Sequence, residues 1–480
     1  MKKKIPIIID WLIKIFLVGL LVQFFLQTFV TYKLWWDGWI WKIVWLWKEI
    51  IILLFILIVG SWIFVAIKNE GFKNFFGKLR KNPIFRFWIY FLITLIISFI
   101  LAVFVQKVGL GTYILSLKYD LLGFLIILLW VWLAWYSPLV NNKYDNLYQS
   151  ILKLTVFWGI FWWLILYLIP WALGLFGYSR TSFEGTIWGN PPAVYYTEIN
   201  RGLIRNQFLF ERPISFGFFL IAFWPVFAFG YLRKQTRKYQ ILWTLWFAFL
   251  ILSTLSRAAM GVWLLETGVI LFLVYWKYTK KILIYLWIPA FIICLCWLWY
   301  FRDIFMRTHS NTWHIVLLEE GVMLWMEKPF AWWWAWYSWP ASHQLCYDYD
   351  ENERCDIIRE INSKYEITTY GYNPENQYVQ IFMEYWFLWL IPWFCCFCWL
   401  IWQGLKVAKD IREETKKWKK SDQKKLSQLY LIFWFGLWLL GLALEGLVLH
   451  SFVDRMIVYP FMLLYWLVWW RNNKEETTED

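Results

Sequence analysis

Four arginines flank apolar segments of the sequence at places where they could hold one anion together. Arg257 stands between two apolar segments, Arg212 precedes another, and Arg302 and Arg307 follow a fourth. A guanidinium group can bind a phosphate through two parallel hydrogen bonds, so a cluster of these side chains would suit a phosphate or pyrophosphate. The alternative is that each arginine only anchors a helix end, with its charged head extended toward water. The spacing leaves both interpretations open.

A second polar group stands where the long hydrophilic segment after residue 301 ends. Glu375 could act there as a general base on a hydroxyl group. Asn376, Gln380 and Glu384 follow at intervals of four residues and would form a stripe along one helix, which in lipid must face protein or a wet cavity. The alternative for Glu375 is an acidic residue that the helix dipole favours in a first turn.

The elements that must position these residues are long apolar segments. Of the 480 residues, 61% are hydrophobic and 17% are charged, whereas soluble proteins contain about 45–50% apolar residues. A run of about 20 apolar residues can cross a bilayer as a helix. The sequence therefore predicts an all-α polytopic membrane protein with about 12 transmembrane helices, and it excludes a disordered chain. The predicted spans lie near 9–31, 41–67, 87–106, 120–136, 151–176, 213–232, 240–256, 258–276, 282–301, 377–404, 427–449 and 455–470.

Lysines and arginines indicate the orientation of these helices, because short cytoplasmic loops carry an excess of both. They concentrate in alternate loops, which places both termini in the cytoplasm and the long loop between helices 9 and 10 outside. The net charge of +14 is mainly this topology signal, and no basic soluble domain is present that would bind nucleic acid. The predicted regions are the N-terminal membrane helices 1–176, the outer loop 177–212, the central membrane helices 213–301, the long extracytoplasmic loop 302–376, the C-terminal membrane helices 377–471 and the cytoplasmic tail 472–480.

Other polar residues carry weaker signals. Glu266 and Glu445 lie within predicted spans and are expected to pair with basic or amide groups. Cys346 and Cys355 share the outer loop, where the compartment allows a disulfide that the spacing cannot establish. The His and Cys residues match no zinc spacing, and the chain has no phosphate-binding glycine loop or nucleotide-binding signature. We therefore expect neither a metal nor a cofactor.

Ordered motifs between about residues 200 and 465 resemble the O-antigen ligase and polymerase family of integral membrane glycosyltransferases. Leu-Ser-Arg-Ala-Ala at 255–259 is similar to the family's Ser-Arg-Gly segment between two helices. Glu-Asn-Gln-Tyr at 375–378, followed by Glu384, resembles the family's His-Asn-x-Tyr-Leu and its later Glu. His450-Ser451 with Asp454 is similar to the closing motif. Glu375 stands where many members have His, which leaves the identity of the catalytic base open.

The resemblance implies a GT-C-like fold in the plasma (inner) membrane and a role in surface polysaccharide biosynthesis. Members of the family transfer a glycan from a polyprenyl-pyrophosphate carrier to an acceptor hydroxyl at the outer face of the bilayer, without a nucleotide sugar and usually without a metal. The acceptor here would be a glycolipid, a glycan or a protein. The resemblance assigns the pyrophosphate to Arg257 and Arg212, with Arg302 and Arg307 as further candidates.

The same resemblance implies a base near the acceptor. Glu375 would be that base and His343 its rival, while Asn376 and Tyr378 would position it. Alternatives within the family are a lipid-linked oligosaccharide polymerase and a protein O-glycan ligase. Outside the family, the chain could be a transporter or flippase of the same lipid-linked sugars. A transporter would be expected to show internal repeats and interrupted helices, and the sequence shows no repeat.

Tryptophan is unusually frequent, with 43 Trp against 24 Gly. Trp gathers at membrane interfaces, yet here it also occurs in the middle of predicted helices, as at Trp132 and Trp243. The stretches 332–339 and 386–389 hold Trp where the family has Gly. We therefore hypothesise that a share of the tryptophans are glycines in the natural protein, through UGA codons read with the wrong table. The alternative is a protein with broad aromatic belts, and UGG codons throughout those two stretches would establish it.

Overall fold

The computed structural model describes part of the chain in continuous stretches and part in single residues. The stretches are 71–80, 203–208, 213–226, 236–274 and 401–414. Single residues and short groups are described between 11 and 111, between 157 and 175, between 394 and 399 and between 429 and 444, as well as 197–198, 210, 228 and 363.

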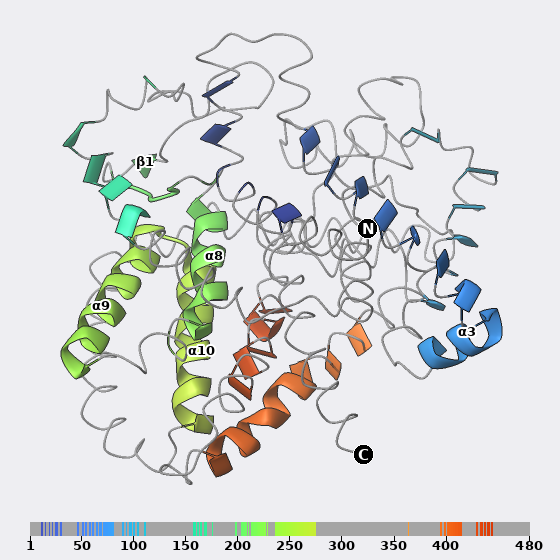
Figure 1. Ribbon diagram of the computed structural model, residues 1–480. Coiled ribbons are helices and arrows are strands. Elements are labelled where there is room, and N and C mark those ends of the chain that lie inside the picture. The colour runs from blue at the N-terminus through green and yellow to red at the C-terminus, as the bar shows by residue number, and fades with distance from the viewer. Residues whose placement is uncertain are drawn as a thin grey trace.

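The best-described region is a group of three helices preceded by a short pair of strands (Figure 1). The two strands are antiparallel, with Thr197 opposite Ile204 and Glu198 opposite Leu203, and they lie within the segment predicted as the outer loop 177–212. The elements with full bounds are α3 (Phe72–Arg80), β1 (Thr197–Glu198), β2 (Leu203–Ile204), α8 (Pro213–Val226), α9 (Arg237–Ser253) and α10 (Arg257–Val274).

Prolines mark both ends of α8. Pro213 is its first residue, where the missing N–H has no intrahelical partner to lose. Pro225 stands in the last turn, where its ring cannot donate to the carbonyl four residues earlier. That last turn is supported from outside, because the indole nitrogen Nε1 of Trp434 donates a hydrogen bond to the carbonyl of Ala222 at 2.7 Å. Trp434 thereby joins the C-terminal helical residues to α8.

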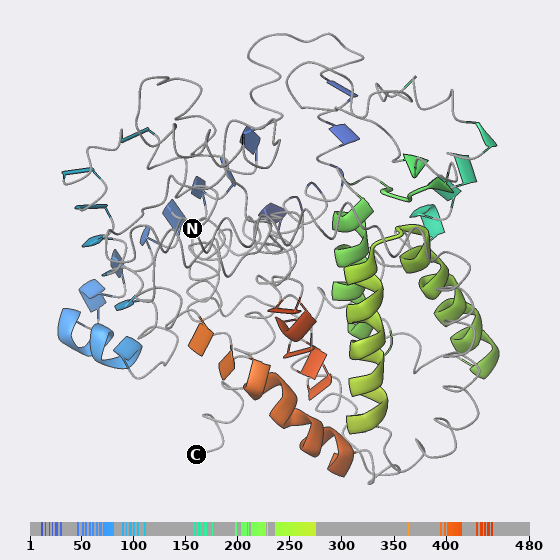
Figure 2. The same ribbon diagram turned by 180° about the vertical axis from the view of Figure 1, so that it is seen from behind.

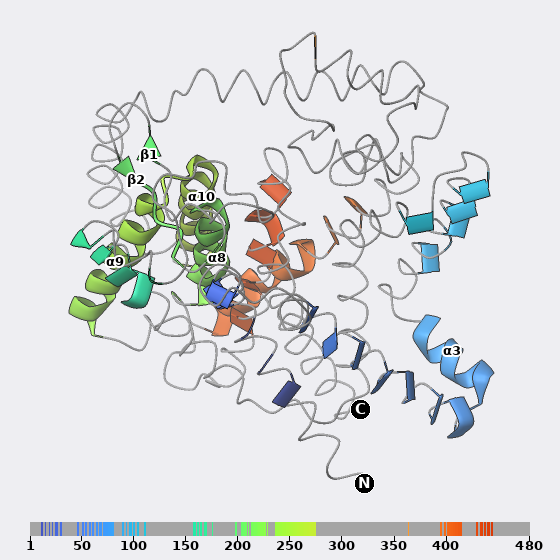
Figure 3. The ribbon, with the colours of Figure 1, turned by 90° about the horizontal axis from the view of Figure 1, so that it is seen from above.

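The three helices pack through their small and aromatic residues. A Cβ atom placed on Gly217 of α8 would lie 2.8 Å from the Cβ of Ala259 on α10, so these two helices approach each other closely. Seen from above, α8 and α10 lie side by side between α9 and the helical residues of the C-terminal part, coloured orange to red (Figure 3). The fully buried apolar residues of this group are Phe216, Leu220, Ala222, Phe247, Leu250, Ile251 and Ala259.

The C-terminal part of the structure packs in the same way. Helical residues 401–414 cross the segment around Gly436 so closely that a Cβ on Gly436 would lie 2.7 Å from the Cα of Gly404. Figures 1 and 2 show residues 401–414 at the end of the helical group away from the turn between α9 and α10. Tight contacts between small residues are typical of helices that pack in a membrane.

Most of the predicted transmembrane helices extend over segments that are only partly described. α8 falls in the segment 213–232, α9 in 240–256 with a start three residues earlier, and α10 in 258–276 with a start one residue earlier. Among the described residues, no helix combines the length and the apolar character needed to cross a membrane. The 14 residues of α8, for example, extend over about 21 Å, against about 30 Å for a hydrocarbon core. The membrane architecture stays a prediction.

Candidate functional site

Arg257 is the one predicted site residue that the structure describes. It is the first residue of α10 and its side chain is half-buried. The remaining predicted site residues lie outside the described residues: Arg212, Arg302, Arg307, Glu375, His343, Asn376 and Tyr378. The candidate site is therefore built outward from Arg257.

The start of α10 suits an anion. The first turn of a helix exposes backbone N–H groups and the positive end of the helix dipole, and the first turn of α10 contains no acidic side chain. Two of its N–H groups are bonded to Ser256, because Ala259 N donates to the hydroxyl at 3.4 Å and Met260 N to the carbonyl at 3.1 Å. The positively charged side chain of Arg257 thus extends from a helix end that is itself positive, and both would attract an anion.

A three-residue turn, Thr254–Ser256, connects α9 to Arg257. Thr254 N and Leu255 N donate to the carbonyls of Ile251 and Leu252 at 3.2 and 3.0 Å, which ends α9. Leu255 has φ +49°, a left-handed conformation that usually requires Gly and costs a residue with a side chain about 1–2 kcal/mol. This conformation reverses the chain, so α10 begins only three residues after Thr254 and runs back beside α9.

A loop that ends shortly before α8 holds this turn in place. The side chain of Arg205 donates from Nε to the carbonyl of Thr254 at 3.0 Å and from Nη2 to the carbonyl of Leu255 at 3.4 Å. These carbonyls lie at the negative end of the α9 dipole, where a cation is favourable. Arg205 is only 7% exposed, so water competes little for its hydrogen bonds. The turn that carries Arg257 is therefore bonded to a second element.

Asn206, the next residue after Arg205, also binds the end of α9. Its backbone N–H donates to the carbonyl of Ser253 at 2.8 Å, and its side-chain Nδ2 donates to the hydroxyl of Ser253 at 3.1 Å and to the carbonyl of Gly159 at 3.2 Å. Its Oδ1 accepts from the N–H of Phe208 at 3.1 Å. Asn206 is fully buried, and it connects three separate parts of the chain through one side chain.

Aromatic residues that follow Asn206 pack against α8. Phe208 and Phe210 follow Asn206 and place their rings 5.5 and 5.7 Å from the ring of Phe216 on α8. Phe208 has φ +48°, a second left-handed residue in the same small region. Two strained residues held by buried hydrogen bonds indicate a fixed local structure, because such conformations persist only where the surroundings determine them.

Sequence reasoning missed Arg205 and Asn206. Both stand in a loop that also contains Arg201 and Arg212. No hydropathy period distinguishes them from those neighbours. The one available signal was position, since Arg205-Asn206-Gln207 is a run of three polar residues close to a helix that begins with Pro213. That signal does not indicate a partner about 50 residues further along the chain.

Glu266 lies farther along α10 and is completely buried. Its carboxylate Oε1 lies close to Gly441, where an added Cβ would approach it to 3.0 Å. Neither of its carboxylate oxygens has a hydrogen-bond partner among the described residues. The basic or amide partner predicted for Glu266 is therefore not found in this part of the chain, and Glu445 lies outside it.

No metal site is found in the part of the chain that the structure describes, where no three His, Cys, Asp or Glu residues lie together. Cys395 and Cys398 are exposed free thiols. Cys346 and Cys355, like all four His residues, lie outside the described residues. The predictions about metal, cofactor and disulfide stay predictions.

Comparison of the chain with known protein families, curated proteins and solved structures gives no match. Membership in a family is therefore not shown. A function for this chain has to be argued from its own motifs and from the geometry around Arg257.

Proposed function

We propose that this chain is an O-antigen ligase-like membrane glycosyltransferase, which transfers a glycan from a polyprenyl-pyrophosphate carrier to an acceptor hydroxyl at the outer face of the plasma membrane. The observation that carries the proposal is the placement of Arg257. It stands in the segment that resembles the family's Ser-Arg-Gly motif, half-buried at the start of α10 on a turn fixed by Arg205 and Asn206.

The chemistry of this placement supports a role in binding pyrophosphate. When an acceptor oxygen attacks the anomeric carbon, the bond from that carbon to the pyrophosphate breaks and negative charge grows on the leaving group. A positioned guanidinium and the positive end of a helix dipole both stabilise that charge. Arg257 and the first turn of α10 supply both, with no acidic residue in that turn to oppose them.

The other residues of the proposed site complete the reaction. Arg212, Arg302 and Arg307 are the further candidates for holding the pyrophosphate. Glu375, or His343 in its place, takes the proton of the acceptor hydroxyl, and Asn376 and Tyr378 position that base. These assignments rest on the resemblance alone, because the seven residues lie outside the described part of the chain.

The exposed surface of α9 supports a place in the bilayer. Its exposed apolar side chains recur at helical spacing along one face, with Leu245 the most exposed at 62%. A continuous apolar face of this kind marks contact with lipid or protein rather than with water. The residues are Ile241, Leu242, Leu245 and Phe249.

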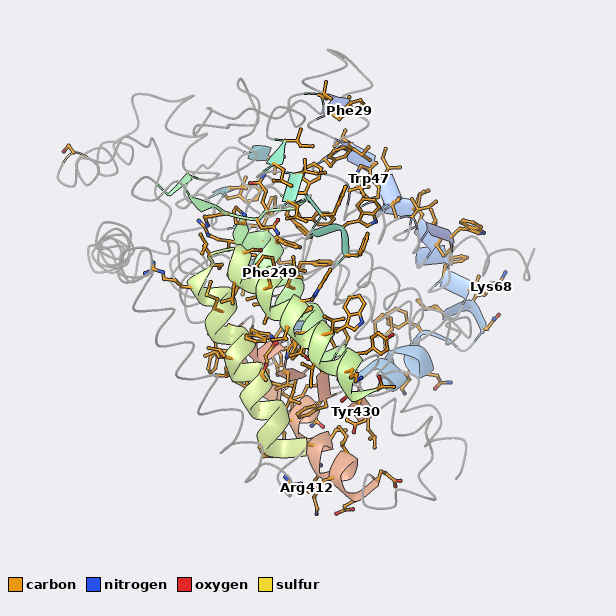
Figure 4. All side chains as sticks on the ribbon, turned by 90° about the vertical axis from the view of Figure 1, so that its left-hand side faces the viewer. Phe29, Trp47, Lys68, Phe249, Arg412 and Tyr430 are labelled. Atoms are coloured by element: carbon orange, nitrogen blue, oxygen red, sulfur yellow. The ribbon has the colours of Figure 1, made fainter. Side chains whose placement is uncertain are left out.

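The distribution of basic residues supports the proposed orientation. Arg257 stands where α10 begins, beside the end of α9, whereas α9 starts with Arg237 and Lys238 at its other end. Residues 401–414, which carry Arg412, also lie at the end away from the α9–α10 turn (Figures 1, 2 and 4). Arg257 on the outside and these basic residues in the cytoplasm agree with the excess of Lys and Arg in cytoplasmic loops.

Substitution of Arg257 by Ala tests the proposal. We expect glycan transfer to fall at least about 100-fold, because loss of one group that stabilises transition-state charge typically costs that much. Transfer would be followed in cells that make a polyprenyl-pyrophosphate-linked O-antigen but lack their own ligase. Arg412→Ala, at the opposite end of the helical group, is the matched control and should retain transfer. Full activity of Arg257→Ala, with normal amounts in the membrane, would remove Arg257 from the mechanism.

The same assay in detergent separates an enzyme from a transporter. Micelles have no two compartments, so a flippase has nothing to transport in them, whereas an enzyme still joins the glycan to its acceptor. We expect the purified chain to form product from an extracted lipid-linked donor and an added acceptor. Transfer that requires sealed vesicles would favour the transporter.

A further inference from the structure

Arg205 makes an unusual use of its charge. Two of its nitrogens donate to backbone carbonyls of the α9–α10 turn, Nε to Thr254 at 3.0 Å and Nη2 to Leu255 at 3.4 Å. Its side chain is almost completely buried. The rigid fork of a guanidinium can reach two neighbouring carbonyls at once, which a lysine ammonium cannot reproduce in the same geometry. Arg205 therefore supports the shape of the turn through two hydrogen bonds to its backbone.

The turn needs such support because Leu255 has φ +49°. A residue with a side chain keeps this conformation only when its surroundings hold it there. Arg205 bonds the carbonyl of Leu255 itself, and the hydroxyl of Thr254 accepts from the N–H of Ser256 at 3.2 Å. Without Arg205, a less strained path of the chain would compete, and the start of α10 would shift with it.

Arg257 would move with such a shift, because it follows Leu255 by two positions and is the first residue of α10. Its guanidinium sits at the end of a long flexible side chain, so its place is set by its backbone and by its half-buried surroundings. We propose that Arg205 is a positioning residue, which acts on the anion-binding function of Arg257 by fixing the Thr254–Ser256 turn. This inference rests on the proposed function for its consequence in binding, but the contact with the turn can be tested alone.

Hydrogen exchange tests the contact. The amides of Thr254 and Leu255 donate to carbonyls of α9, and the amide of Ser256 donates to the Thr254 hydroxyl. In the full chain in detergent, Arg205→Lys should speed their exchange about tenfold, while amides in the middle of α9 stay unchanged. Arg412→Lys is the matched control. Unchanged exchange at the turn in Arg205→Lys would overturn the inference, whatever the function of the protein.

A double-mutant cycle tests the consequence. The probe is farnesyl pyrophosphate, a short isoprenyl pyrophosphate, and its dissociation constant would be measured by calorimetry on the folded full-length variants. Arg205→Lys should weaken binding about three- to tenfold when Arg257 is present, and by less than about twofold when Arg257 is replaced by Ala. This pattern is expected only if Arg205 acts through Arg257. Equal losses in both backgrounds would mean an independent contribution of Arg205 and would overturn the positioning role.

The two experiments fail separately. If Arg257→Ala binds farnesyl pyrophosphate as tightly as the unchanged chain, the proposed function of Arg257 is wrong, and with it the binding consequence. Faster exchange at Thr254, Leu255 and Ser256 would then still establish Arg205 as the residue that fixes this turn. If Arg257→Ala weakens binding but Arg205→Lys does not, the proposed function stands and the positioning role falls.

Discussion

Two contacts around the three helices differ in how far hydrogen bonds satisfy their buried polar groups. At the α9–α10 turn, the side chains of Arg205 and Asn206 are buried and form hydrogen bonds with backbone and hydroxyl groups. Farther along, the rings of Trp224 and Trp263 pack at 5.7 Å between α8 and α10, and the indole Nε1 atoms of both are buried without a hydrogen-bond partner among the described residues. Buried indole N–H groups usually find a partner.

Whether the indole N–H of a buried Trp has a hydrogen-bond partner indicates whether the local structure requires that Trp. Trp434 is also buried, and it donates to the Ala222 carbonyl, so it is satisfied in the way that buried tryptophans usually are. Trp263 stands between Ala259 and Thr267 at intervals of four residues on α10. Small residues at this spacing allow close packing of membrane helices. Trp224 and Trp263 are therefore stronger candidates than Trp434 for positions where the natural protein has Gly.

Of the changes at the polar contact and at the close approach of α8 to α10, the larger loss of stability is expected at Asn206. Asn206→Ala removes the bonds to Gly159 and Ser253 and the acceptor for the N–H of Phe208, and leaves these groups buried. We expect a loss of about 3 kcal/mol in the free energy of unfolding, measured by chemical unfolding in detergent. Asn206→Asp keeps the acceptor for Phe208 but places a carboxyl oxygen against the Gly159 carbonyl in a fully buried site, so it should lose at least as much. Equal stability of Asn206→Ala and the unchanged chain would mean that the polar contact does not hold the helices.

A smaller loss is expected where α8 approaches α10. In Gly217→Ala the new Cβ would lie 2.8 Å from the Cβ of Ala259, so the helices must move apart. We expect a loss of about 2 kcal/mol in the free energy of unfolding, as is typical when a packed core is overfilled. Gly261→Ala is the matched control, because nothing lies within 4 Å of its Cβ position, and it should lose no stability. The opposite order of the two variants would contradict the close approach.

Local signals in the sequence were sufficient to locate α9 and α10 but not their contacts. Two apolar segments with a polar break predicted helices on both sides of Arg257, and α9 ends at Ser253 while α10 begins at Arg257. The role of Arg205 could not be predicted in this way, because its partners Thr254 and Leu255 are 49 and 50 residues away. The contact of Arg205 with the turn depends on how its loop folds back over the helices. Neither the hydropathy of the sequence nor the spacing of its residues indicates that path.

The smallest loss of stability is expected for the double variant Trp224→Gly/Trp263→Gly, and its size decides between the two explanations of the Trp excess. Replacing a buried Trp by a small residue typically costs about 3–5 kcal/mol, and Trp434→Gly should lose that much because its ring is buried and bonded. If Trp224 and Trp263 stand where the natural protein has Gly, the double variant Trp224→Gly/Trp263→Gly should lose less than about 1 kcal/mol, because α8 and α10 can close the space and no unsatisfied indole remains. Chemical unfolding in detergent gives the comparison directly. A loss as large as that of Trp434→Gly would mean that both rings belong to the packing, and that this is a protein with native aromatic belts.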